Sequence, residues 1–250
     1  MSVLTSEAVV LRTWPVHEAD LIVSIFTRDY GRVRGVAKSA LKSRKRFGGA
    51  LEPMTLARAW FAERPRQELV RLDQLEIVRS PLSLPVDAAR MTVLSFFAEL
   101  LDEALPERDP QDAVFRLLVS VLEQTTAVES ETVQPWMPLT YFQLWMMRLM
   151  GLLPDVSHCT ACGEALCAAE IFFNRLGDGL FCAVHRSGDA SELTADSWQL
   201  AQRMLRAPVA AFAAEVWPRR RAQDLRRFTL QSLERHLERK LRTAEALGRL

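Results

Sequence analysis

The sequence lacks the features of a secreted or membrane-bound protein. Its first residues include Glu7 and carry no basic segment of the kind that opens a signal peptide. The most apolar stretch, residues 136–154, is interrupted by Pro138, Gln143 and Arg148, whereas a membrane span needs about 18 consecutive apolar residues. We therefore expect a cytoplasmic protein without a membrane partner, in which this stretch forms a helix buried in a core.

The usual signatures of catalysis are also missing. The chain has no phosphate-binding loop of the form GxxxxGKS/T. Its nearest carboxylate pairs, Asp102–Glu103 and Glu129–Glu131, lie in acidic polar segments that are typical of a solvated helix surface. His17 and His236 have no evident partner in the sequence. We therefore expect no enzymatic activity, and ATP hydrolysis or cleavage of a DNA strand would contradict this expectation.

Cysteine is scarce, with four residues, and in a cytoplasmic protein such residues are more often thiols or metal ligands than disulfides. Three of them belong to two short motifs, Cys159-x-x-Cys162 and Cys182-x-x-His185. A gap of two residues lets both side chains of a motif reach one metal ion, and four protein ligands leave no open position. The pattern predicts a structural zinc site formed by Cys159, Cys162, Cys182 and His185. The alternatives are buried thiols without a metal, or Cys167 in the place of His185.

Residues 1–80 have the alternating apolar pattern of strands. In the segment 20–27, for example, Leu21, Val23 and Ile25 share one face. Five short strands in about 75 residues are typical of a small closed barrel. The OB-fold is the leading candidate, and an SH3-like barrel is the alternative. The predicted strands are Glu7–Trp14, Asp20–Thr27, Arg32–Lys38, Met54–Ala62 and Glu68–Val78.

After residue 80 the apolar spacing changes to three and four residues, which predicts helices. Thr194 is a suitable N-cap for one of them. The predicted fold is therefore of the α+β multidomain class. It has an OB-fold barrel in residues 1–80 and an α-helical domain in residues 81–250, interrupted by a small zinc-binding insert at about 155–188. The predicted helices are Met91–Leu105, Asp112–Gln124, Trp136–Leu152, one that follows Thr194, and one that begins near Arg219 and continues past Leu241.

The net charge of +1 hides an uneven distribution. Residues 1–80 carry 14 basic and 9 acidic residues, residues 81–158 carry 4 and 11, and residues 159–250 carry 14 and 11. The densest basic stretch has no acid between Asp29 and Glu52. Such a density suits a phosphate backbone, because each neutralised phosphate releases a counterion. Strands 2 and 3 of an OB-fold and the neighbouring loops also contact nucleic acid. The sequence therefore predicts DNA binding by Arg32, Arg34, Lys38, Lys42, Arg44, Lys45 and Arg46.

Other interpretations of these residues stay open. The basic stretch can be a solvated surface that only aids solubility. Phe47, Trp60 and Phe61 can offer surfaces on which bases stack, but a place in the barrel core is the simpler interpretation. The second basic cluster, at Arg219–Arg221 and Arg226–Arg227, can lie beside a partner-binding groove or on the solvated face of a helix.

The opening of the chain resembles that of the bacterial recombination mediator RecO family. The similarity lies in the HEAD turn at residues 17–20, the YGR sequence at 30–32, the AKSA sequence before the basic loop, and the LEP sequence at 51–53. The resemblance covers nearly the whole chain. The helical middle is similar in character, and the cysteine insert falls where many members carry a zinc-binding loop. Ser39 stands where the family has glycine, and His185 stands where a fourth cysteine is more usual.

The resemblance implies a function that the residues alone do not show. It implies a DNA repair protein that binds single- and double-stranded DNA and anneals complementary strands. It also implies contact with the tail of single-strand binding protein (SSB), and work with RecR (and RecF) to load RecA onto SSB-coated DNA, in the cytoplasm at the nucleoid. The alternatives from the residues are a zinc-ribbon regulator that reads one DNA sequence, and an interaction scaffold that does not contact DNA.

Overall fold

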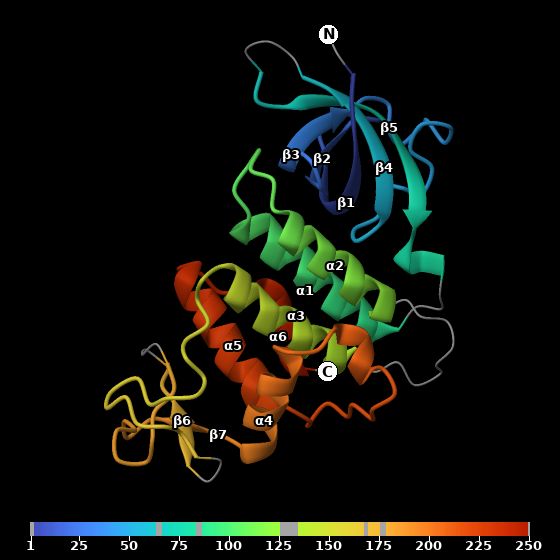
Figure 1. Ribbon diagram of the computed structural model, residues 1–250. Helices are drawn as coiled ribbons and strands as arrows, with labels where there is room; N and C mark the ends of the chain where they lie inside the picture. The colour runs from blue at the N-terminus through green and yellow to red at the C-terminus, as the bar shows by residue number, and fades with distance from the viewer. Residues whose placement is uncertain are drawn as a thin grey trace. The chain divides into compact units, whose positions relative to one another are not determined.

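The computed structural model of the chain describes residues 3–63, 67–83, 87–125, 135–167, 170–175 and 179–249. The chain divides into two compact units (Figure 1). The first unit comprises Met1–Val119 and Leu241–Leu250, and the second comprises Ser120–Lys240. The helix that follows the barrel strands belongs to the same unit as the barrel. The predicted domain division after residue 80 remains a prediction.

The first unit contains a closed five-stranded barrel in the order β1-β2-β3-β5-β4. All neighbouring strands are antiparallel except β3 and β5, which pair in parallel over Gly35–Ala37 and Val70–Leu72. The prediction of five strands is confirmed, although β1 already begins at Val3, and β4 begins only at Leu56. The strands are β1 (Val3–Pro15), β2 (Leu21–Thr27), β3 (Gly31–Ala37), β4 (Leu56–Ala62) and β5 (Val70–Arg79).

Two glycines allow the backbone to pass where a side chain has no room. A Cβ at Gly35 would lie 2.7 Å from Val70 Cγ2, so glycine lets β3 and β5 meet and close the barrel. Gly31 has a φ of +68° and lies against the backbone of Asp109, where a Cβ would approach the carbonyl oxygen to 2.3 Å. Glycine adopts this left-handed conformation without steric cost, so Gly31 allows the tight turn before β3.

Helices complete the first unit. Helix α1 (Ala88–Ala104) begins at the N-cap Asp87, whose side chain accepts a hydrogen bond from the Arg90 backbone N–H. The C-terminal helix α6 (Arg242–Arg249) packs against α1, and the Glu99 carboxylate accepts the backbone N–H groups of Arg242 and Thr243, both at 2.9 Å. A carboxylate at a helix N-terminus satisfies free amides and complements the helix dipole. Helix α2 (Asp112–Thr125) starts in this unit, and a short 3₁₀ turn, η1 (Pro81–Ser83), precedes α1.

The second unit is mainly helical. Helix α3 (Trp136–Leu149) is buried along most of its length, which confirms the buried helix expected in the apolar stretch. Its end matches a Schellman motif, because Gly151 N–H donates to Arg148 O and Leu152 N–H donates to Met147 O. Over the described ranges, no helix has the length and apolar character that crossing a membrane requires. The other elements are β6 (Ile171–Phe173), β7 (Ser191–Leu193), α4 (Ala195–Met204), η2 (Val209–Phe212) and α5 (Gln223–His236).

The prediction of one continuous C-terminal helix is wrong. Helix α5 ends at His236, and α6 begins as a separate helix at Arg242. Glu238 has a φ of +53°, and Arg239 N–H donates to Glu234 O at 3.1 Å, so the chain leaves the helix in a second Schellman-like turn. The N-cap expected for α4 is confirmed, because the Thr194 side chain accepts a hydrogen bond from Ser197 N–H.

Candidate nucleic-acid interface and metal centre

The basic stretch from Lys38 to Arg46 lies in the loop between β3 and β4, and apolar residues of this loop pack into the barrel core. Ala40, Phe47 and Ala50 of the loop belong to the barrel core, and Phe47 is only 1% exposed. Phe61 is buried in the same core, which confirms the core position expected for two of the three aromatic residues, while Trp60 is half-buried. Apolar residues hold the loop at three points, and Lys42, Arg44 and Lys45 between them are exposed to solvent.

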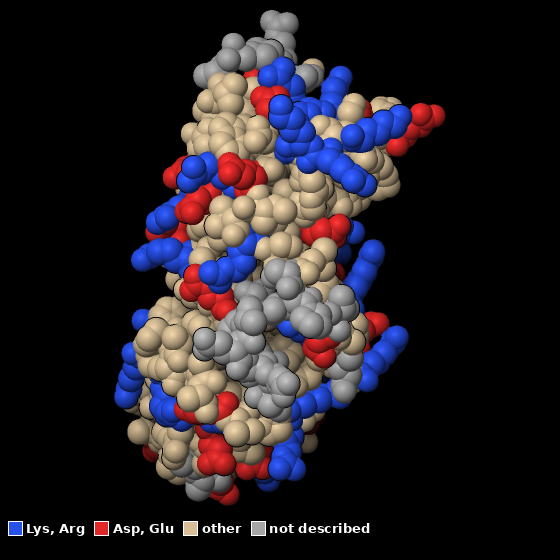
Figure 2. Space-filling view, turned by 90° about the vertical axis from the view of Figure 1, so that its right-hand side faces the viewer, with Lys and Arg blue, Asp and Glu red and all other residues tan. Residues whose placement is uncertain are grey.

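Four of the seven predicted DNA-binding residues are exposed on this loop: Lys38, Lys42, Arg44 and Lys45. Within the part of the chain that the structure describes, none of the four is paired with a carboxylate. Figure 2 shows Lys and Arg side chains gathered over the barrel. Cations without neighbouring anions keep a positive surface potential, which attracts a phosphate backbone.

Arg46 has a structural role in the same loop. Its guanidinium donates to Ser43 Oγ at 2.9 Å and to the Lys38 carbonyl at 2.6 Å, and it lies over the Phe47 ring at 5.1 Å. The Arg46 carbonyl in turn accepts the backbone N–H of Leu75 in β5 at 2.9 Å. Arg46 therefore shapes the loop on the barrel, and its predicted contact with DNA remains a prediction.

Arg32 and Arg34 lie on β3 and already have protein partners. The Arg32 guanidinium donates to the Leu105 carbonyl at 2.9 Å and lies 3.6 Å from Asp102 and 3.5 Å from Glu107. The side chain of Arg32 is 12% exposed. Arg34 Nε donates to Glu107 Oε1 at 2.5 Å. These carboxylates compete with phosphate, so the contact that the sequence predicts for the two arginines is less favourable than for the four free cations.

The sequence led us to expect Asp102 on a solvated helix surface, and this expectation is wrong. Its side chain is 10% exposed and accepts a hydrogen bond from the Ser24 hydroxyl at 2.6 Å, besides its ion pair with Arg32. It therefore joins α1 to strands β2 and β3. The other predicted carboxylate pair, Glu129–Glu131, lies outside the described residues.

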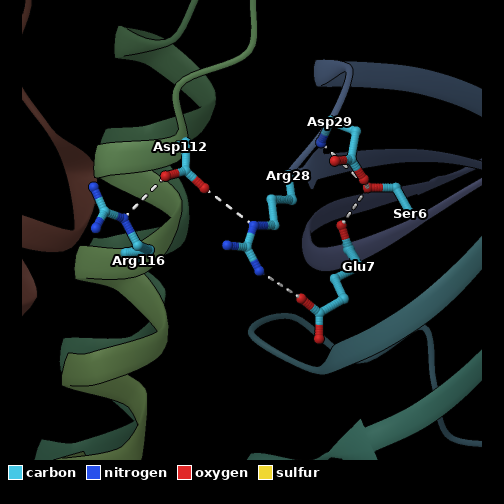
Figure 3. Close-up of polar contacts among 6 residues, drawn as sticks. All are labelled: Ser6, Glu7, Arg28, Asp29, Asp112 and Arg116. Atoms are coloured by element: carbon cyan, nitrogen blue, oxygen red, sulfur yellow. Dashed lines mark hydrogen bonds and ion pairs between the residues drawn. The ribbon is translucent and has the colours of Figure 1, made fainter.

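A second polar cluster occupies the turn between β2 and β3 (Figure 3). Arg28 donates to Asp112 Oδ1 at 3.0 Å and to Glu7 Oε2 at 3.3 Å, and these hydrogen bonds, the one to Asp112 first, raise the pKa of Arg28. Beside it, the Ser6 hydroxyl donates to Asp29 Oδ2 at 2.6 Å. Arg28 is therefore another arginine of the barrel whose charge is balanced, which leaves the β3–β4 loop as the better phosphate site.

The predicted metal ligands come together in the second unit. One ligand atom from each of Cys159, Cys162, Cys182 and His185 lies within 4.8 Å of the others. Cys182 Sγ and His185 Nδ1 are 3.3 Å apart, and the Cys182 backbone N–H donates to Cys159 Sγ at 3.5 Å. Three thiols and one imidazole are a donor set that tetrahedral zinc accepts. These four residues can hold a metal ion.

Backbone amides favour the thiolate form of two of the three cysteines. Burial opposes charge on Cys159, but the amides of Cys182, Cys162 and Ala161 outweigh it and lower the pKa of Cys159. In the same way, amides of His185 and Val184 lower the pKa of Cys182 against the effect of burial. For Cys162, the backbone hydrogen bond from Glu164 lowers the pKa, but burial and the neighbouring Cys159 and Cys182 outweigh it and raise the pKa. Metal ligation needs the thiolate form, so Cys159 and Cys182 are the two thiols that the protein itself prepares for a cation.

Close packing between the two motifs depends on Gly179. Its φ is +108°, and a Cβ there would lie 1.9 Å from Thr160 Oγ1. Thr160 N–H donates to the Leu180 carbonyl at 2.9 Å, which joins the segment just before the second motif to the first motif. The neighbouring residues do not join the group: Cys167 is exposed, and His158 pairs with Asp155 at 2.7 Å.

The basic cluster near the C-terminus is not a uniform solvated face. Arg226 is 8% exposed, donates to Thr140 Oγ1 at 2.9 Å and to the Arg221 carbonyl at 2.8 Å, and lies over the Trp136 ring. Burial lowers the pKa of Arg226 to about 10, so the guanidinium remains charged at neutral pH. Arg226 therefore joins α5 to α3 in the core of the second unit. The interpretation of Arg226 as a residue on the solvated face of a helix is therefore wrong.

Family models match nearly the whole chain. The family model "Recombination protein O N terminal" matches residues 1–81, and "Recombination protein O C terminal" matches residues 85–245. The chain belongs to the recombination protein O family. The family resemblance noted in the sequence is thereby confirmed, and the chain is a member of a DNA repair protein family.

Individual relatives match this chain over nearly the full length of both proteins. The DNA repair protein RecO of Koribacter versatilis (strain Ellin345) is 52% identical over 245 residues, which are 98% of each chain. The protein of the same name from Anaeromyxobacter sp. (strain K) is 33% identical over 235 residues, 93% of this chain and 91% of the relative. That from Pelotomaculum thermopropionicum is 29% identical over 251 residues, 100% and 95% of the two chains.

Proposed function

We propose that the chain is a recombination mediator that binds DNA and has no enzymatic activity of its own. In this role it binds single- and double-stranded DNA and promotes the annealing of complementary strands. It works with RecR (and RecF) to load RecA onto single-stranded DNA coated with SSB, whose tail it contacts. Family membership supports the role in DNA repair, and the specific partners follow from the resemblance.

The observation that carries the proposal is the anchored loop with four exposed cations, Lys38, Lys42, Arg44 and Lys45, on a closed barrel. The strand order β1-β2-β3-β5-β4, with a parallel β3–β5 pair, supports the assignment of the barrel as an OB-fold. Side chains of this kind neutralise phosphates and carry no base-specific pattern. Binding is therefore salt-dependent and only weakly dependent on sequence, which argues against a regulator that reads one site.

The cysteine insert has a structural role in this proposal. Zn²⁺ bound by Cys159, Cys162, Cys182 and His185 would complete a tetrahedral site without an open position, so it would stabilise the insert and not take part in chemistry. Measurement of zinc in the purified protein tests this part: about one equivalent is expected for the wild type and much less for Cys159→Ala.

The loop is tested by binding a labelled single-stranded oligonucleotide at several salt concentrations. The test variant replaces Lys42, Arg44 and Lys45 by alanine and keeps Arg46, because Arg46 holds the loop in place. If each replaced residue contacts one phosphate, the slope of log K against log salt becomes shallower by about 2, since a single-stranded phosphate contributes about 0.7. Affinity should fall with it.

A matched control removes the same charge elsewhere. Arg206, Arg239 and Arg249 are all exposed and lie outside the barrel, so their replacement by alanine should leave affinity and slope nearly unchanged. Equal binding by the wild type and the folded loop variant would refute the proposal. Equal losses in the loop and control variants would show that only net charge matters. A DNA-stimulated ATP hydrolysis or nuclease activity would contradict the non-enzymatic role.

A further inference from the structure

The outer face of the barrel carries a row of side chains that runs across four strands. Trp14 pairs with Ile22, Ile22 pairs with Val36, and Val36 pairs with Arg71. The residues that alternate with them in β2, β3 and β5 belong to the barrel core, so this row points outward. All four side chains are half-buried. A tryptophan and two branched aliphatic residues on an outward row form a partly exposed apolar surface, and contact of such a surface with water is unfavourable.

Another part of this outer face is covered within the same unit. Phe26 stacks edge-on against Phe115 of α2 at 5.5 Å, and Ser24 donates to Asp102 of α1. Arg32 and Arg34, which flank this part of β3, pair with Glu107. The barrel therefore has a covered half, where α1, α2 and the turn after α1 bind the strands, and an open half. In the open half, among the described residues, the half-buried Trp14 row makes no hydrogen bond or ring contact with these helices.

The open half has the chemistry of a platform for a base. The Arg12 guanidinium lies 5.1 Å from the centre of the Trp14 ring, and Arg12 is exposed. At the other end of the row, Val36, Leu69 and the cationic Lys38 line a hollow of about 320 Å³, with Gln67, Glu68, Val70 and Arg71. Of the two cations among these described lining residues, Arg71 is paired with Asp73 at 2.7 Å, whereas Lys38 is not paired with a carboxylate.

The platform is continuous with the cationic loop. Lys38 follows β3 directly and belongs to both surfaces. The backbone N–H of Ser39 donates to Asp20 Oδ1 at 2.7 Å, and that of Leu41 donates to the Ala19 carbonyl at 3.2 Å. These bonds fix the start of the loop to the turn that follows Trp14, so a strand whose phosphates lie on the loop can place its bases on the row.

We infer that the row Trp14–Ile22–Val36 stacks unpaired nucleobases, with Trp14 as the main stacking residue, and thereby gives the protein a preference for single-stranded DNA. The inference rests on the proposed function, because it needs DNA held on the loop. Bases of a duplex are stacked on one another and cannot lie on the platform, whereas every unpaired base offers a π-face to an aromatic side chain. The loop then supplies affinity for any DNA, and the row distinguishes single strands from duplexes.

The test compares Trp14→Ala with the wild type on a single-stranded oligonucleotide and on a duplex of the same sequence. Loss of one base–aromatic stack is expected to weaken single-strand binding by about 5- to 150-fold. Duplex binding and the salt slope should stay unchanged, because no phosphate contact is removed. Trp14→Phe keeps an aromatic ring and should recover most of the affinity, which separates stacking from a failure to fold.

Trp60→Ala is the matched control, since Trp60 is another half-buried tryptophan, placed on β4 between Thr5 and Gln74. It should bind single strands as the wild type does. An oligonucleotide without bases removes the stacking partner, so on this probe Trp14→Ala and the wild type should bind equally. If the loop variant loses binding but Trp14→Ala does not, the platform is refuted while the proposed function stands. If neither variant loses binding, both are refuted.

Discussion

Replacement of Asp102 by alanine tests the joint between helix α1 and the barrel. The Asp102 carboxylate accepts a hydrogen bond from Ser24 at 2.6 Å and lies 3.6 Å from the Arg32 guanidinium. Ser24 is fully buried, and the side chains of Asp102 and Arg32 are 10% and 12% exposed. The alanine variant therefore leaves a buried hydroxyl and a nearly buried cation with fewer partners.

The structure limits the size of the loss. A hydrogen bond to a charged group contributes about 1.5–3 kcal/mol, and breaking a buried ion pair costs about 3–5 kcal/mol when the remaining charge has no other partner. Arg32 keeps Glu107 at 3.5 Å and the Leu105 carbonyl at 2.9 Å, so the larger figure does not apply. We expect Asp102→Ala to lower the free energy of unfolding of the first unit by about 2–3 kcal/mol.

Urea unfolding of Asp102→Ala, Ser24→Ala and the double variant measures the contact itself. The double-mutant cycle should give a coupling of about 1–2 kcal/mol, because the two side chains touch. Glu52→Ala is the control for loss of one negative charge, since Glu52 is exposed, and it should change stability by less than about 0.5 kcal/mol. A coupling near zero, or equal effects of Asp102→Ala and Glu52→Ala, would refute the reasoning.

Two further predictions concern the second unit. Gly179→Ala places a Cβ at a φ of +108° and 1.9 Å from Thr160 Oγ1, so it should destabilise the insert by at least about 2 kcal/mol and reduce the bound zinc measured per chain. For Asp224, burial raises the pKa, but hydrogen bonds from Ser197, Thr194 and Leu225 outweigh it and hold the pKa below the ordinary value. A carboxyl group whose pKa is lowered by folding stabilises the fold at pH values above its unfolded pKa of about 3.9. This stabilisation is lost as the pH falls through the lower pKa of the folded state. The stability gap between the wild type and Asp224→Asn should therefore shrink from pH 7 to pH 3, and a gap that stays constant would show that the carboxylate is not responsible.

Local patterns predicted the strands but not how they close. Alternation of apolar residues placed β2 within one residue of its observed start, because a strand with one face in a core must alternate. The parallel pair of β3 and β5 joins Gly35–Ala37 to Val70–Leu72, which lie far apart in the sequence. No local pattern reports such a pairing, and the small size of Gly35 at the contact is understood only once β5 is in place.

The two helix ends show what a sequence can and cannot indicate. Helix α3 ends at Leu149, whereas the predicted helix ran to Leu152. The signal for the earlier end was present in the sequence, because Gly151 takes the left-handed conformation without cost and so marks the end of a helix. Helix α5 ends in the same kind of turn, but there the left-handed residue is Glu238. A glutamate in this conformation has no sequence signal, and the apolar stripe continues through Leu241, so the pattern predicted one helix where there are two.

The metal ligands and the cations differ in how far the sequence could assign them. Cys159 and Cys162, like Cys182 and His185, are close in sequence, so each motif brings two donors together locally. The fold has only to bring the two motifs together. A cation has no such local partner. The arginines of β3 and the buried Arg226 look like the free cations of the loop in the sequence, and only the fold shows which of them meet carboxylates or carbonyls.

The same argument explains why Trp14 does not stand out in the sequence. An apolar residue on a strand is as easily understood as core, and Phe47 and Phe61 in the same barrel are indeed core. What distinguishes Trp14 is the register across β1, β2 and β3, which places it on the outer face, and the position of the helices, which cover the other half of that face. Arg32 lies under this cover, Arg34 pairs with Glu107 at its edge, and Lys38 lies beyond it. One strand and the residue that follows it therefore carry both arginines bound to the fold and a lysine that remains available for DNA. The basic stretch serves two purposes because helices cover only part of the barrel. Substitutions at the edge of the covered half should therefore separate effects on stability from effects on DNA binding.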